Sequence, residues 1–146
     1  APAIGYFAGN FMSGKFSRRW GINRMILWGS VVNAVGVGIS LLIHLSGAGS
    51  VLVFFGFMTA VGFGNGMVIP NATSGSLSVV PHLAGTASGL GGAIMIGGGA
   101  ALSALAGSLL TLETGAVPLL LIMFASAVAA ILAIFYVYHR ERQLVR

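Results

Sequence analysis

The stretch MILWGSVVNAVGVGISLLIHL, Met25 to Leu45, is apolar throughout and contains no Asp, Glu, Lys or Arg. An α-helix rises about 1.5 Å per residue, so about 20 residues cross the hydrocarbon core of a bilayer, which is roughly 30 Å thick. The stretch has the length and the composition that such a helix needs. It therefore predicts a membrane-spanning helix.

The composition of the whole chain agrees with a membrane protein. Of its 146 residues, 57% are hydrophobic and only 6% are charged, whereas a soluble domain carries about 25% charged residues. This small number of charges cannot cover a surface that faces water. The lipid bilayer is therefore the expected partner. The chain has no cysteine, which excludes disulfides and thiolate metal sites.

Three further apolar runs have the length of a span, at about Val51 to Ile69, Ala84 to Leu110 and Ala116 to Tyr138. A shorter run, Ala1 to Met12, reaches about 18 Å, and we interpret it as the C-terminal half of a span whose start is missing. The sequence thus predicts an all-α, polytopic transmembrane helix bundle of four full spans and a partial one, with a tail over 139–146.

The basic residues form two groups on either side of the four full spans. Lys15, Arg18, Arg19 and Arg24 precede them, and Arg140, Arg142 and Arg146 follow them. An even number of spans puts both groups on one side, and the positive-inside rule makes that side the cytoplasm. The basic residues form no stripe interleaved with exposed aromatic residues, so no nucleic-acid partner is expected.

The first basic group resembles the loop motif of the major facilitator superfamily, Gly-x-x-x-Asp-Arg-x-Gly-Arg-Arg. Gly14 and Gly21 fit its glycines and Arg19 fits its first arginine, whereas Arg24 follows one position late. Arg18 stands where the motif has Asp, so the contact that the acidic member makes in that family is not expected here. These residues are expected in a short cytoplasmic loop.

A longer match lies in GFGNGMVIPNATSGSLSVVPHLAGTASGLGG, Gly62 to Gly92. Pro70-Asn71-Ala72 and Ala84-Gly85-Thr86-Ala87-Ser88 resemble the region between the tenth and eleventh helices of Bcr/CflA-type drug:proton antiporters, a branch of the same superfamily. The resemblance implies the part of an inner-membrane transporter from late helix 8 to helix 12. It also implies export of amphipathic drugs in exchange for protons, with no cofactor, and the missing N-terminal half as partner.

Glycine and proline predict how the helices pack. Pro70 should kink or end its helix, because proline lacks a backbone N–H. The pairs Gly5/Gly9, Gly62/Gly66 and Gly85/Gly89 have the small-x-x-x-small spacing, which permits close approach of helices. The span that begins at Ala84 continues this glycine-rich pattern through Gly99, so we expect it to pack closely against neighbouring helices.

A substrate cavity is predicted from polar residues within the spans. Phe54, Met58, Val61 and Asn65 share one helical stripe, which suits an amphipathic drug; the alternative is helix packing with Asn65 hydrogen-bonded to a neighbour. Asn33, in the preceding span, is interpreted as such a packing residue. Further candidates for the cavity are Ser88, Gly92, Met95 and Gly99 on the next helix and Tyr6 and Asn10 on the partial one.

No catalytic or metal-binding set is expected. The chain has no Asp, no Ser-His-acid set and no cluster of His and carboxylates, so an enzyme is not predicted. Because the four full spans lack Asp and Glu, the residue that couples transport to protons is expected in the missing half. Two alternatives stay open: an exporter of another small solute, such as a sugar or an amino acid, and a small membrane scaffold that oligomerises through its glycine faces.

Overall fold

The computed structural model describes residues 2–79 and 81–144. Its helices are α1 (Pro2–Trp20), α2 (Ile22–Leu45), α3 (Val51–Val79), the short 3-10 helix η1 (Pro81–Leu83), α4 (Ala84–Leu109) and α5 (Val117–Leu144). The described residues contain no strand. The predicted all-α helical bundle is therefore confirmed.

Four helical segments are long and apolar enough to cross a membrane: Ile22–Leu45, Val51–Val79, Pro81–Leu109 and Val117–Leu144. Each of the four predicted apolar runs falls within one of these segments, except that the third run and the fourth run each extend one residue beyond it. Large apolar side chains are exposed along the outside, among them Ile96 on α4, which is 72% exposed. Such a surface is suited to lipid and not to water, so the structure indicates a multi-pass membrane protein.

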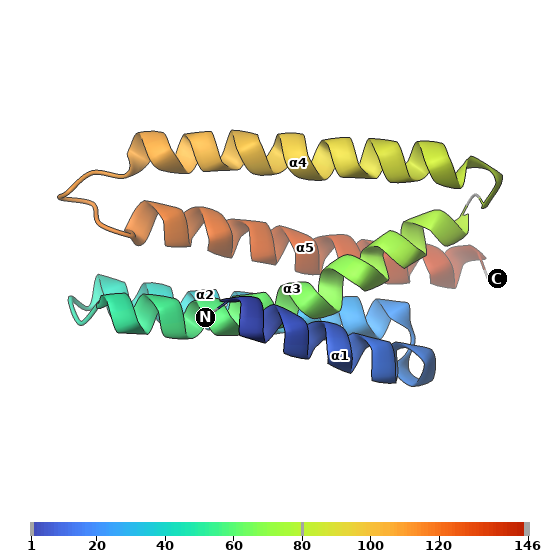
Figure 1. Ribbon diagram of the computed structural model, residues 1–146, viewed down its shortest axis with the longest axis horizontal. Helices are drawn as coiled ribbons and strands as arrows, with labels where there is room; N and C mark the ends of the chain where they lie inside the picture. Colours follow the sequence, from blue (N-terminus) through green and yellow to red (C-terminus); the bar gives the residue numbers. More distant parts are fainter. Residues whose placement is uncertain (1, 80, 145–146) are drawn as a thin grey trace.

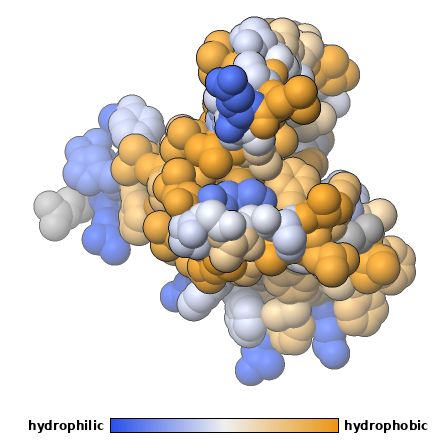
Figure 2. All heavy atoms as spheres, turned by 90° about the vertical axis from the view of Figure 1, so that its left-hand side faces the viewer, coloured by the Kyte–Doolittle hydropathy of each residue, from blue (hydrophilic) through white to orange (hydrophobic). Residues whose placement is uncertain are grey.

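The helices lie roughly antiparallel, with α3 between α1 and α2 and with α5 beside α2 (Figure 1). A small apolar core of Val37, Leu41 and Leu120 joins α2 to α5, and Phe54 and Met58 of α3 pack against it. Helix α4 stands apart from the rest: seen end-on it forms a lobe that projects from the other helices (Figure 2), and Ala106 is its one buried residue among those described. The bundle is thus tightly packed around α3 and open around α4.

The basic segment near the N-terminus differs from the expected loop. Helix α1 continues past Met12 to Trp20, so Gly14, Arg18 and Arg19 lie on a helix, and Arg24 lies in the first turn of α2. The chain turns at Gly21 alone, where φ is +85° and ψ is 152°. A side chain is strongly disfavoured in that conformation, so a single glycine separates the two helices.

Pro70 lies inside α3, which continues to Val79. Because proline has no N–H, one hydrogen bond of the helix is missing there. The C-terminal part of α3 rises away from α1 and α2 toward the start of α4 (Figure 1). Just after the proline, buried Asn71 donates to Ser13 Oγ of α1 over 2.6 Å and to Met67 O over 2.7 Å, which ties this part of α3 to α1.

Glycines form the seam between α1 and α3. A Cβ on Gly5 or Gly9 would collide with the backbone of α3 at Thr59 and Phe63, and a Cβ on Gly66 would come within 2.8 Å of Asn10 N. The pairs Gly5/Gly9 and Gly62/Gly66 therefore face each other across one interface. A Cβ on Gly85 or Gly89 would meet no atom within 4 Å, so this third pair has no helix against it within the described chain.

Candidate functional site

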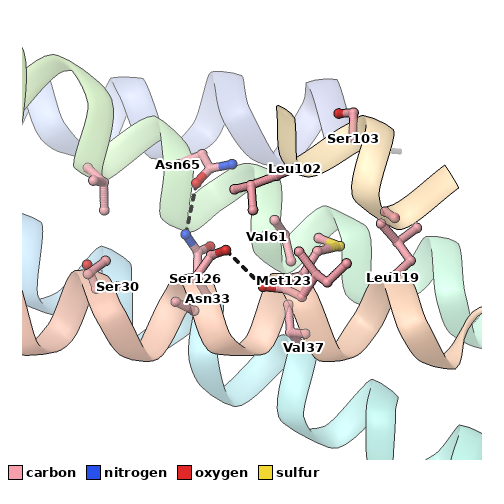
Figure 3. Close-up of a pocket in the computed structure, with 15 residues that line it drawn as sticks. Ser30, Asn33, Val37, Val61, Asn65, Leu102, Ser103, Leu119, Met123 and Ser126 are labelled. Carbon is pink, nitrogen blue, oxygen red and sulfur yellow. Dashed lines mark hydrogen bonds between the residues drawn. The ribbon is translucent and has the colours of Figure 1, made fainter. Parts of the chain in front are cut away.

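A pocket of about 310 Å³ lies among α2, α3, α4 and α5 (Figure 3). Its walls are mostly apolar, with side chains such as Val37, Val61, Leu102, Leu119 and Met123. Five residues with uncharged polar side chains also line it: Ser30, Asn33, Asn65, Ser103 and Ser126. A volume near 300 Å³ with few polar groups is at the small end of the range for sites that bind small molecules.

Two amides meet at the side of this pocket. Asn33 Nδ2 of α2 donates to Asn65 Oδ1 of α3 over 2.9 Å (Figure 3). The bond is partly buried, and it joins two helices that also approach closely at Gly29 and Gly64, where a Cβ on Gly29 would lie 2.7 Å from Gly64 O. The pair therefore holds one wall of the pocket and leaves the Asn65 amide group to donate elsewhere.

Two polar atoms of pocket-lining residues are buried without a hydrogen-bond partner among the described residues. They are Ser30 Oγ and Asn33 Oδ1. Ser126 differs, because its hydroxyl donates to Ile122 O of its own helix over 2.8 Å. An unpaired buried polar group is costly, so these two atoms are the least satisfied polar groups beside the pocket.

The structure brings two of the four residues of the predicted stripe to this pocket. Asn65 lines it, together with Val61, whereas Phe54 and Met58 pack against the apolar core near the other end of α3. The hydrogen bond to Asn33 is the packing role that was the alternative interpretation of Asn65. In this structure Asn65 both packs against α2 and borders the pocket.

The predicted residues of α4 lie elsewhere. Ser88, Gly92 and Met95 do not line the pocket, and Met95 is 59% exposed. A Cβ on Gly92 or Gly99 would meet no atom within 4 Å. The part of α4 that reaches the pocket is Leu102, Ser103 and Ala106, further along the helix.

Tyr6 and Asn10 are not brought to the pocket either. They lie on α1, which packs on α3 and contributes no residue to the pocket lining. Asn10 Nδ2 donates to Tyr6 O, one turn earlier on the same helix, over 2.9 Å. The two residues thus form a local pair apart from Asn65.

Sequence reasoning did not select Ser30, Ser103 or Ser126, or any residue of α5. Helix α5 is apolar along most of its length, so no face was distinguished. One signal was present: Ser126 is the single Ser, Thr, Asn or Gln between Val117 and Phe135. A lone hydroxyl in an apolar span is common, because it can bond to its own helix as Ser126 does, so the signal was weak.

The basic residues lie at one end of the bundle, where α1 ends, α2 begins and α5 ends (Figure 1); Arg146 is outside the described residues. At this end Asn23 Nδ2 of α2 donates to Glu141 Oε1 of α5 over 2.8 Å. Glu113 lies between α4 and α5 at the opposite end. Among the described residues, no three His, Asp or Glu side chains are grouped closely enough to hold a metal ion.

Comparison of the chain with family models, with curated proteins and with solved structures finds no match. The description of the molecule therefore rests on its own sequence and geometry. It is a multi-pass bundle of membrane-spanning helices with an uncharged, amide-bordered pocket among four of them.

Proposed function

We propose that this chain is part of a secondary active transporter of the major facilitator type, which exports amphipathic drugs in exchange for protons. The observation that carries the proposal is the pocket beside Asn33 and Asn65. Its apolar walls suit the body of an amphipathic molecule, and its amide and hydroxyl groups suit one or two polar substituents. The resemblance of Gly62 to Gly92 to the Bcr/CflA-type antiporters supports the same function.

The packing of the helices supports a moving bundle. Transporters alternate between outward-open and inward-open states largely by rocking one helix bundle against another. The glycine seam joins α1 to α3 tightly, whereas the glycines of α4 from Gly85 to Gly99 have open space where a side chain would lie. In our proposal, the N-terminal half of the transporter packs on this face of α4.

The orientation follows from the charges. We place the basic end of the bundle in the cytoplasm, because Lys and Arg are enriched on that side of membrane proteins. The membrane is then the inner or plasma membrane of the cell. The proposal involves no enzymatic step, no cofactor and no nucleic acid.

The lining of the pocket also bears on whether the transported molecule is another solute, such as a sugar or an amino acid. An amino acid carries two charges, and a sugar offers a hydroxyl group on almost every carbon. The pocket has no charged side chain and five polar ones, which favours a more apolar molecule. An oligomeric scaffold is supported by the same exposed α4 face, and it differs in predicting no substrate-dependent flux.

The test uses the complete protein in cells that lack other efflux pumps. We expect energised cells to extrude a fluorescent amphipathic cation such as ethidium, and a protonophore to stop the extrusion. Asn65→Leu should reduce extrusion because it removes the amide beside the pocket. The matched variant Asn10→Leu removes an amide from α1, away from the pocket, and should extrude normally.

Three outcomes would contradict the proposal. Extrusion that continues with the protonophore would argue against proton exchange. Equal loss in both variants would argue against the pocket. Counterflow of a labelled sugar or amino acid, without movement of the dye, would assign the protein to another solute.

A further inference from the structure

A second pocket, of about 680 Å³, lies between the first turns of α2 and the last turns of α5. Arg24, Leu27 and Trp28 line it from α2, and Phe135, Tyr138, His139 and Arg142 line it from α5. It shares no lining residue with the pocket beside Asn33 and Asn65.

Within the described part of the chain, the lining of this pocket carries positive charge and no carboxylate side chain. Two guanidinium groups line it, those of Arg24 and Arg142, whereas neither of the chain's two carboxylates does. Glu141 instead lines the adjoining groove, which Arg24 also borders, and it accepts the hydrogen bond from Asn23 there. Because Asn23 precedes Arg24 and Glu141 precedes Arg142, this hydrogen bond also holds the two arginine-bearing helix ends together.

The aromatic side chains place the pocket at the level of lipid headgroups. Trp28 is 57% exposed and Phe135 is 55% exposed, and both lie where an apolar helix meets its charged end. Tryptophan and tyrosine gather at this depth in membrane proteins, because their rings are apolar with one polar edge. The pocket therefore offers cations toward the water and rings toward the acyl chains.

We propose that this pocket binds the phosphate group of an anionic phospholipid. Arg24 and Arg142 contact the phosphate oxygens, to which guanidinium groups donate paired hydrogen bonds. Leu27, Trp28 and Phe135 contact the start of the acyl chains. Basic pockets between membrane helices bind lipid headgroups in this way, and the bound lipid would bridge α2 and α5 at the end where Asn23 and Glu141 already join them.

Trp28 makes the proposal measurable, because the chain has only two tryptophans. In the variant Trp20→Phe, all tryptophan fluorescence comes from Trp28. We expect phosphatidylglycerol brominated in its acyl chains to quench this fluorescence more strongly than brominated phosphatidylcholine, when each is titrated into a bilayer of unbrominated phosphatidylcholine holding the full chain. The difference reports preferential occupation of the pocket by the anionic lipid.

The arginines are then replaced in the Trp20→Phe background. Arg24→Gln with Arg142→Gln should weaken the preference for phosphatidylglycerol by about 30-fold, equal to about 2 kcal/mol. The matched control, Arg18→Gln with Arg19→Gln, removes the same charge from the same end of the bundle and should keep the preference. Quenching by brominated phosphatidylcholine is the reference within each variant, since a misfolded variant would change it as well.

Equal quenching by both lipids would overturn the proposal, as would a preference that Arg18→Gln with Arg19→Gln removes and Arg24→Gln with Arg142→Gln retains. Millimolar inorganic phosphate, compared with chloride at the same ionic strength, distinguishes the source of the phosphate group. A preference that persists in phosphate supports a lipid. Displacement by phosphate but not by chloride would assign the pocket to a soluble phosphate compound and overturn the lipid assignment.

Discussion

Asn33 on α2 donates a hydrogen bond to Asn65 on α3 over 2.9 Å, and its own Oδ1 lies where a Cβ on Gly64 would collide with it. The amide pair therefore depends on the glycine beside it. The same three residues set how closely α2 and α3 approach along the wall of the pocket. The Asn33–Asn65 pair thus both packs α2 against α3 and borders the candidate substrate pocket.

We expect Asn33 and Asn65 to be energetically coupled. A hydrogen bond between membrane helices contributes about 0.6 kcal/mol on average. A double-mutant cycle of Asn33→Ala and Asn65→Ala, measured by unfolding in mixed detergent micelles, should give a coupling of about that size. Additive effects of the two substitutions would show that the bond contributes nothing to stability.

The seam between α1 and α3 predicts a position-dependent effect of bulk at glycine. Gly9→Leu should lower the free energy of unfolding by about 1–3 kcal/mol, because it forces apart backbones that are in contact. Gly97→Leu, on the open face of α4, should leave the stability of this chain unchanged. Thermal denaturation in detergent measures both, and equal melting temperatures would contradict the packing described for α1 and α3.

Gly21 predicts a further contrast within the basic segment. Gly21→Ala should destabilise the chain by roughly 1–3 kcal/mol, since φ at this residue is +85°. Gly14 belongs to the same segment but lies inside α1, with open space where a Cβ would be. Gly14→Ala should therefore stabilise the helix by about 1 kcal/mol. Chemical unfolding of the two variants would test the turn, and the same shift in both would contradict it.

The proposed orientation predicts the side on which each connection lies. Topology reporters fused at Gly21 and Arg142 should report the cytoplasm, and those fused at Gly47 and Glu113 should report the opposite side. The physical reason is that the basic groups stay where the membrane potential and the insertion machinery favour positive charge. An external signal at Gly21 or Arg142 would contradict the orientation.

The two glutamates are not expected to couple transport to protons. Moving a proton through the membrane normally requires a titratable group held within the bundle, and Glu113 and Glu141 lie at its ends. Glu113→Gln and Glu141→Gln together should leave proton-driven dye efflux by the complete protein largely unchanged. The side-chain amide that Glu141→Gln introduces keeps an oxygen that can accept from Asn23, so the junction of α2 and α5 is retained. Uncoupled transport in this double variant would place the coupling group here.

The amino-acid sequence by itself determined the class of molecule and the extent of its apolar helices. That information is local: an uninterrupted run such as Met25 to Leu45 has one low-energy conformation in lipid, because only a helix pairs all its backbone groups internally. The sequence also indicated that the two basic groups lie at a common end of the bundle, because an even number of spans separates them. The spacing of Gly5/Gly9 and Gly62/Gly66 indicated close packing, although not that the two pairs face each other.

The tertiary structure decided which residues meet. Asn65 borders the pocket and bonds to Asn33, whereas Phe54 and Met58 of the same stripe pack against the apolar core. The reason is that a helical stripe extends over several turns, while a pocket spans only one or two. Ser126 lies beside residues of α2 and α3, and Arg142 lies beside residues of α2; these helices are distant from α5 in sequence. Gly21 ends α1 where a loop was expected, since the basic residues before it are compatible with a helix in water and only its positive φ makes the turn. Such outcomes depend on contacts between helices, and a periodic pattern within one helix does not contain them.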